Sequence, residues 1–209
     1  MSEEVNAEGA SQPLPELDLK VRRVLGVLVE KAKTTPDAYP LSLNALVTGS
    51  NQKSNRDPVL DLKEEDVDEA LVWAKNHGLV TKVIGGRVDR WRHLLYEAWN
   101  VNKVELAILG ELLLRGPQTE GELRTRASRM EPIEGLDELR SVLKPMTERK
   151  LVVYLTDEDR RGAVLTHGFH HAGELAQLKT RARSAQQASP SSTGEGRVGV
   201  GSGSASIAG

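Results

Sequence analysis

Three histidines in the stretch HGFHH are the side chains of this 209-residue chain with the clearest capacity for chemistry: His167, His170 and His171. Imidazoles this close together can bind zinc or nickel. No carboxylate stands at a suitable spacing beside them, however, and the stretch follows an apolar segment typical of a strand. We therefore expect a solvated strand end here, and we predict neither a metal nor another cofactor.

Motifs of catalytic sites are absent from the sequence, which has no glycine-rich phosphate loop, no G-x-S-x-G and no H-E-x-x-H. It has no cysteine either, which excludes thiolate zinc sites and cysteine nucleophiles and fits a reducing compartment. Neighbouring carboxylates such as Glu64 and Glu65 stand where a helix begins, and acids are favourable there. We predict no enzymatic activity and no small-molecule substrate.

A polar stretch, NQKSNRDPVL at residues 51–60, is a candidate binding loop through Asn51, Lys53, Asn55 and Arg56. The matching segment in the second half of the chain, EPIEG, is short and acidic, so the fold alone does not require this loop. Two interpretations remain open. Either the loop binds a ligand or partner, or it is held by its own hydrogen bonds, with Arg56 paired to a carboxylate.

Arginines gather in two further places, and they are candidate contacts to nucleic-acid phosphates. They are Arg87, Arg90 and Arg92 around a Gly-Gly pair, and Arg124, Arg126 and Arg129 on a helical segment. The alternative is a solvated arginine face with partners one helical turn away, such as Glu122 for Arg126.

The elements that must position these side chains occur twice. VLGVLVEK at residues 24–31 matches ILGELLLR at residues 108–115, with Leu-Gly and the final basic residue in register. Each copy has helical apolar spacing, and each is followed by a proline-containing turn and two more helical segments. Two short strands around a turn then complete each copy. Three helices followed by a β-hairpin is the order of a winged-helix domain.

We therefore predict an α+β, mostly helical protein with two tandem winged-helix domains, at residues 16–97 and 98–170, each with a β-hairpin wing. Residues 171–184 form a short basic segment with helical character. The acidic residues 1–15 and the glycine- and serine-rich residues 185–209 are predicted to be disordered.

Four segments carry a resemblance to a known family: RVLGVLVEKAKTTPDAYPLSLNALVTGSNQKSNRDPV, RWRHLLYE, ELAILGELLLRGPQTEGELRTRASRM and GFHH. They resemble the YceH-like family, a bacterial family of tandem winged-helix proteins whose biochemical function is not established. The resemblance covers roughly residues 17–170, implies the fold, and supplies no catalytic or ligand residues. Two positions depart from the family pattern. Glu120 replaces an expected proline, and Lys63 stands where a capping serine or threonine is usual.

A winged-helix protein normally reads DNA with the first half of its third helix. That half is acidic in both copies, as LKEEDVDEA and EGLDELR, and phosphates repel such clusters. The leading hypothesis is a non-enzymatic protein that binds double-stranded DNA, or a DNA-associated complex, through the wing and helix arginines. The alternative is a protein–protein adaptor or homodimer without direct DNA contact.

The chain is expected to be cytoplasmic and to make no contact with membranes. No apolar run approaches the ~20 residues that span a bilayer. The start of the sequence, MSEEVNAEGASQPLPE, is acidic and lacks the apolar core of a signal peptide.

Overall fold

The first half of the chain folds into three α-helices, one short 3₁₀ helix and a three-stranded sheet. The computed structural model describes residues 14–188, so most of the two predicted disordered ends lies outside the described residues. The elements in this half are α1 (Leu19–Thr34), η1 (Pro36–Ala38), β1 (Leu41–Ser42), α2 (Leu43–Ser50), α3 (Glu64–Asn76), β2 (Val80–Val83) and β3 (Arg90–His93). We name residues 80–93, which form the β2–β3 hairpin, the first wing.

The second half repeats this order after a short connecting helix, α4 (Leu95–Ala98). Its elements are α5 (Lys103–Arg115), β4 (Gln118–Thr119), α6 (Glu120–Ala127), α7 (Leu136–Glu148), β5 (Val152–Tyr154) and β6 (Val164–His167). The hairpin at residues 152–167 is the second wing. A last helix, α8 (Ala172–Ala188), follows it. This helix extends through residues 185–188, which we had predicted to be disordered, because alanine and glutamine are good helix formers.

The two sheets have the same antiparallel topology, with strand orders β1-β3-β2 and β4-β6-β5. In the first sheet, Leu41 pairs with Trp91 and Val80 pairs with His93. The first strand of each sheet, β1 or β4, has only two residues and directly precedes a helix. That helix is capped by the last strand residue, Ser42 for α2 and Thr119 for α6.

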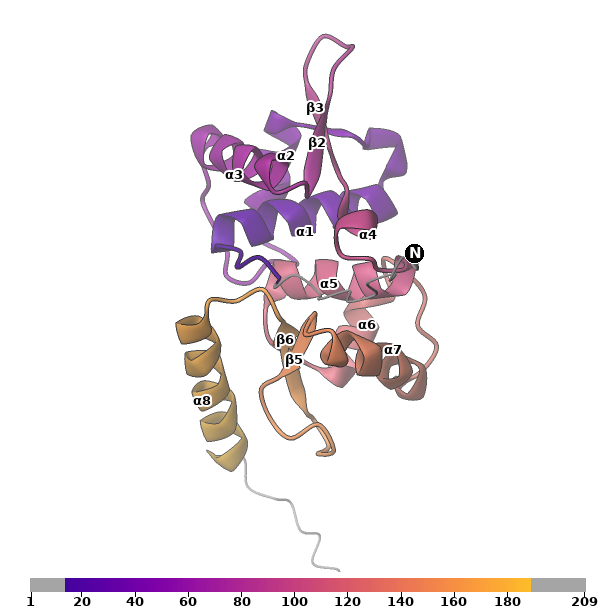
Figure 1. Ribbon diagram of the computed structural model, residues 1–209, viewed down its shortest axis with the longest axis vertical. Helices are drawn as coiled ribbons and strands as arrows, with labels where there is room; N and C mark the ends of the chain where they lie inside the picture. The colour runs from indigo at the N-terminus through magenta and orange to yellow at the C-terminus, as the bar shows by residue number, and fades with distance from the viewer. Residues whose placement is uncertain (1–13, 189–209) are drawn as a thin grey trace, which may run out of the picture.

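Helices α1 and α5 pack against each other at the centre of the molecule and join its two halves (Figure 1). Glycines let the two backbones come close: a Cβ built on Gly26 would lie 2.8 Å from Leu114 Cγ, and one on Gly110 would lie 2.6 Å from Val29 Cγ1. A single hydrophobic cluster extends from Leu17 through both halves to Phe169. The two winged-helix units therefore share one continuous core.

The two wings project from opposite ends of the molecule, the first at the top of Figure 1 and the second at the bottom. Helices α3 and α7 likewise lie on opposite sides of the central pair, and α8 lies beside the second sheet. The equivalent surfaces of the two winged-helix units, namely the wings and the third helices, thus face away from each other.

Candidate functional site

The loop at residues 51–60 is closed by its first side chain. Asn51 donates from Nδ2 to the carbonyl of Leu62 at 2.7 Å and accepts from the Leu62 N–H at 2.7 Å. The exposed Lys53 has no side-chain partner within residues 14–188. Of the four candidate loop residues, Lys53 is therefore the one available for an outside contact.

Arg56 is buried and paired with a carboxylate, as the second interpretation of the loop required. Its Nη2 lies 2.6 Å from Glu30 Oε2, and its Nη1 donates to Glu30 Oε1 at 3.2 Å. It also donates to the Gly49 carbonyl at 3.0 Å and to Gln52 Oε1 at 3.0 Å. Burial alone would raise the pKa of Glu30, but hydrogen bonding and the charge of Arg56 hold it below its ordinary value.

A second buried arginine, Arg23 on α1, also binds the same loop. It donates to the carbonyls of Ser50, at 2.9 Å, and of Pro58, at 2.5 Å, on either side of the loop. Burial, together with the nearby positive charge of Arg56, lowers the pKa of Arg23 to about 10. In the sequence, Arg23 stands within an apolar run, between Val21 and Val24. A charged residue at such a position is the signal that could have indicated a buried arginine.

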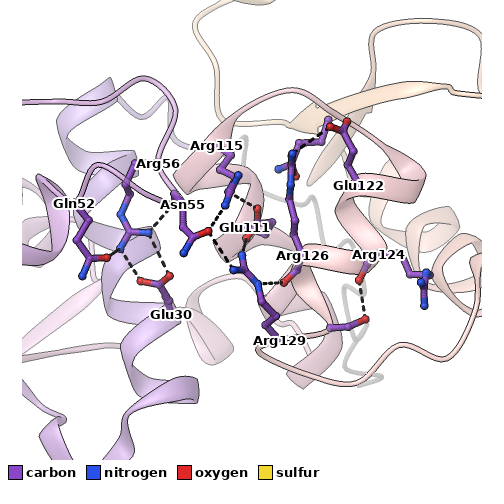
Figure 2. Close-up of polar contacts among 12 residues, drawn as sticks. Glu30, Gln52, Asn55, Arg56, Glu111, Arg115, Glu122, Arg124, Arg126 and Arg129 are labelled. Carbon is purple, nitrogen blue, oxygen red and sulfur yellow. Dashed lines mark hydrogen bonds and ion pairs between the residues drawn. The ribbon is translucent and has the colours of Figure 1, made fainter.

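Asn55 connects the loop to the second half of the chain (Figure 2). Its Oδ1 accepts hydrogen bonds from Arg115 on α5 and, at 3.1 Å, from Arg129 beyond α6. Glu111, buried beneath them, lies 3.1 Å from Arg115 and 3.7 Å from Arg129. Burial raises the pKa of Glu111 despite these cations. The loop thus serves as a polar bridge between the two winged-helix units.

The three arginines of the second group are already engaged within the chain, and Figure 2 shows the contacts of Arg126 and Arg129. Arg124 donates to the carbonyls of Ile133 and Glu134, both at 3.3 Å. Arg126 donates to Gln118 at 2.7 Å and to Glu122 at 3.1 Å. Because Arg129 is held by Asn55 and by the Arg126 carbonyl, contact with a phosphate would require these bonds to be exchanged.

The arginines of the first wing are exposed, in contrast to the second group. Arg90 donates to the Pro40 carbonyl at 2.9 Å. Within residues 14–188, no hydrogen bond or ion pair engages the side chains of Arg87 and Arg92. The structure therefore does not bring the two arginine groups together, since one lies on the first wing and the other beside the interdomain loop.

The tip of the first wing exposes apolar side chains beside Arg87, a feature that the sequence analysis missed. Ile84 is 80% exposed, Val88 is 54% exposed and Val83 is 38% exposed. Next to the tip, Lys82 pairs with Asp89 at 2.6 Å and lies over the ring of the buried Trp91. A cleft of about 630 Å³ separates the wing from the acidic start of α3.

The histidine stretch is mostly buried, so the expectation of a solvated strand end was wrong for His167 and His170. Their rings stack with centroids 3.9 Å apart. His170 Nδ1 accepts from Arg22 on α1 at 2.5 Å and lies 3.1 Å from Glu174 on α8, a carboxylate one helical turn away. The exposed His171 is hydrogen-bonded to Glu16.

Burial lowers the pKa of both His167 and His170, which favours neutral rings. Within residues 14–188, no three His, Cys, Asp or Glu side chains are grouped so that they could hold a metal ion. The stretch instead ties the end of the second wing to α1 and to the start of α8.

Glu120, the departure from the family pattern, is a structural residue of the second unit. Its backbone N–H donates to the Ala163 carbonyl at 3.2 Å, a bond that proline could not make. Its buried carboxylate accepts from Arg140 at 2.8 Å and from the Tyr154 hydroxyl at 2.7 Å. These residues line a cleft of about 450 Å³ between α7 and the second wing.

These elements define a class of protein: three helices followed by a β-hairpin, repeated once, make a tandem winged-helix protein of the α+β class. The predicted fold class is confirmed. Within residues 14–188, each helix is too short or too polar to span a bilayer.

The chain belongs to the family described as "Protein of unknown function, DUF480", whose model matches residues 17–161. It is 47% identical to a UPF0502 protein of Rhodopirellula baltica, over 94% of this chain and 84% of that protein. It is 41% identical to a UPF0502 protein of Pseudomonas aeruginosa, over 86% and 79% of the two chains. The resemblance to a bacterial family without an established function is thereby confirmed.

One solved structure has a partial likeness to the chain: subunit VPS25 of the endosomal trafficking complex ESCRT-II. The likeness covers 76% of this chain and 92% of that one, with 16% sequence identity and a TM-score of 0.25. Similarity this low carries no information about function.

Proposed function

We propose that this protein is a non-enzymatic, cytoplasmic scaffold that binds a protein partner through the tip of its first wing. The observation that carries the proposal is the exposure of Ile84, flanked by Val83 and Val88, at the end of a projecting hairpin (Figure 1). Exposed apolar side chains gathered in one region of a protein surface typically mark interaction sites. The rigid joint between the two units would hold the wing in a fixed direction.

The charges of the molecule also favour a protein partner over DNA. The exposed first turns of α3 and α7 contain acids, and the arginines of α6 are held in intramolecular bonds. In addition, the wings project from opposite ends, so a single straight duplex could not lie along both (Figure 1). These features disfavour the usual docking of a winged helix in the major groove.

DNA binding remains the second candidate because Arg87 and Arg92 are exposed on the first wing. A wing with two such guanidinium groups could lie along phosphates without inserting a helix. Either function would use the same hairpin, so variants of its tip can separate the two.

The test is a pull-down from native bacterial lysate, with and without nuclease, followed by mass spectrometry. Ile84→Ser/Val88→Ser changes the apolar tip, and Leu136→Ser, at another exposed apolar position, is the matched control. We expect proteins that remain bound after nuclease treatment, are lost with the tip variant and are retained with the control. Identical protein sets for all three forms would contradict the proposal.

The second candidate is tested with purified protein and a fluorescent random duplex at low salt. Binding with a dissociation constant on the order of 10 µM or tighter, weakening steeply with salt, would support it. Arg87→Ala/Arg92→Ala should then abolish binding, whereas Lys53→Ala should not. Absence of binding, or binding without salt dependence, would rule out this candidate.

A further inference from the structure

A groove of about 540 Å³ runs between α8 and the second wing, at the opposite end of the molecule from the first wing. Leu155, Val164, Leu178 and Ala182 form most of its apolar lining. Leu155 is buried, yet it stands outside the hydrophobic cluster that joins the two units. The groove therefore has an apolar floor of its own.

The groove follows from the small side chains that α8 turns toward the sheet. Leu178, Arg181, Ala182 and Ala185 line it, with the i, i+3, i+4, i+7 spacing of one helical face. The two alanines are too short to fill the space above Leu155 and Val164. The start of helix α8 is anchored through Glu174, and an apolar groove lies beside its later turns.

The charged residues that line the groove are both arginines. Arg161, from the turn of the second wing, and Arg181, from α8, are exposed, and their side chains make no hydrogen bond or ion pair within residues 14–188. The acids of the same turn, Glu158 and Asp159, line the separate cleft beside α7 instead. An occupant of the groove would therefore meet positive charge at its rim.

We propose that this groove binds an acidic, amphipathic segment of a partner protein. Apolar side chains of the segment lie on the floor, and its carboxylates pair with Arg161 and Arg181. The size of the groove is within the usual range of about 300–1,000 Å³ for ligand pockets. Nucleic acid fits less well because its phosphate backbone is charged and has no apolar groups to pack against an apolar floor. This site is independent of the first wing.

The test is a selection of phage-displayed random dodecapeptides on the full-length protein. We expect enriched peptides to combine leucine-like side chains with aspartate or glutamate, and their synthetic versions to bind in fluorescence anisotropy. No enrichment over a protein-free surface, or enriched peptides without acidic residues, would overturn the proposal.

Matched variants on α8 locate the binding site. Arg181→Glu should weaken binding of the selected peptides by about tenfold or more, because it replaces attraction by repulsion at a charged contact. Arg183→Glu makes the same change two residues away, off the face that lines the groove, and should leave the dissociation constant within about twofold. Both residues are exposed, so neither change should disturb folding, and circular dichroism checks this.

Two results with these variants would overturn the proposal. One is equal peptide binding by wild-type protein and Arg181→Glu, which would place the peptides elsewhere. The other is salt-dependent binding of random duplex DNA that is lost in Arg181→Glu, which would make the groove a nucleic-acid site. Leu178→Glu provides a second probe, since it removes apolar floor and should also abolish peptide binding.

Discussion

At the scale of single residues, Arg56 shows how a side chain from a polar surface loop can become part of the interior. Its guanidinium is fully enclosed and satisfied by Glu30, Gln52 and two carbonyl groups. Removing one member of a buried ion pair leaves the other charge without compensation, which costs more than the pair itself contributes. Arg56 therefore stabilises the loop even if the loop has a further binding role.

Arg56→Ala should lower the free energy of unfolding by about 3–5 kcal/mol, because the largely buried Glu30 loses both hydrogen bonds to Arg56 and keeps only a contact with Lys31 at 3.6 Å. Urea denaturation followed by circular dichroism measures this loss. Lys53→Ala, in the same loop but exposed, is the control and should stay within about 0.5 kcal/mol of wild type. A loss below about 1 kcal/mol for Arg56→Ala would mean that the loop is not held by this residue.

His93, at the base of the first wing, makes stability depend on pH. Burial, together with the positive charges of Lys33 and Arg92, lowers its pKa to about 4. Between about pH 6.5 and pH 4 the unfolded chain binds a proton at this residue that the folded chain does not, so stability falls as the pH falls. This contribution is complete above pH 6.5.

His93→Gln should therefore flatten the decline in stability with falling pH. Between pH 6.5 and pH 5, the slope of the unfolding free energy against pH should decrease by up to ~1.4 kcal/mol per pH unit. This value corresponds to the uptake of about one proton on unfolding. Urea denaturation of both forms at several pH values tests this. An unchanged slope would show that the ring is accessible to protons in the folded state.

At the scale of elements, the sequence predicted what depends on local pattern. The repeat, the helices and the two hairpins follow from apolar periodicity and turn residues. Thr119 and Glu122 form a capping box at the start of α6, a pattern that is also local in sequence. The roles of the polar residues could not be predicted in this way. The partners of Arg56 and Asn55 lie 26, 60 and 74 positions away along the chain, so local spacing gives no sign of them.

The histidine stretch was misread for the same reason. His170 is covered by α1, which is distant in sequence, and by α8, which begins two residues later. Apolar periodicity cannot show which surface such a helix will cover. The sequence did contain one hint. Arg22 and Arg23 interrupt the apolar run of α1, and charged residues on a buried helix face indicate buried polar partners.

Helix α8 depends on Arg22 for its attachment to α1. This arginine donates to His170 at 2.5 Å and to Glu174 at 2.9 Å. Arg22→Ala should therefore speed amide hydrogen exchange in α8 by about tenfold relative to α5, since charged hydrogen bonds contribute about 1.5–3 kcal/mol each. Arg183→Ala, on the same helix, should leave the ratio unchanged. Equal acceleration in α5 and α8 would indicate general destabilisation instead.

At the scale of the whole molecule, the contact between α1 and α5 decides whether the two units move independently. Domains move relative to each other by default unless their interface is large and hydrophobic. Here the interface is the middle of a continuous core, and polar bridges at Asn55 and between Lys33 and Glu131 support its edge. We therefore expect one cooperative unfolding transition, in which circular dichroism and tryptophan fluorescence coincide.

A substitution at Gly110 tests whether the close packing of α1 and α5 stabilises the whole molecule, because this glycine lets the two helices approach each other. Gly110→Ala should lower the free energy of unfolding by about 1–3 kcal/mol, since the new methyl group meets Val29 of the other unit. Gly121→Ala is the control. It is the second residue of α6, its Cβ would meet nothing within 4 Å, and the change should leave the free energy of unfolding within about 0.5 kcal/mol of wild type.

The double variant Gly110→Ala/Val29→Ala separates a clash from a local effect on α5. If the clash with Val29 causes the loss of stability in Gly110→Ala, shortening Val29 to alanine should reduce that loss. A double-mutant cycle would then show a coupling energy of about 0.5 kcal/mol or more. Additive losses would mean that the cost of the added methyl group does not arise from its contact with Val29.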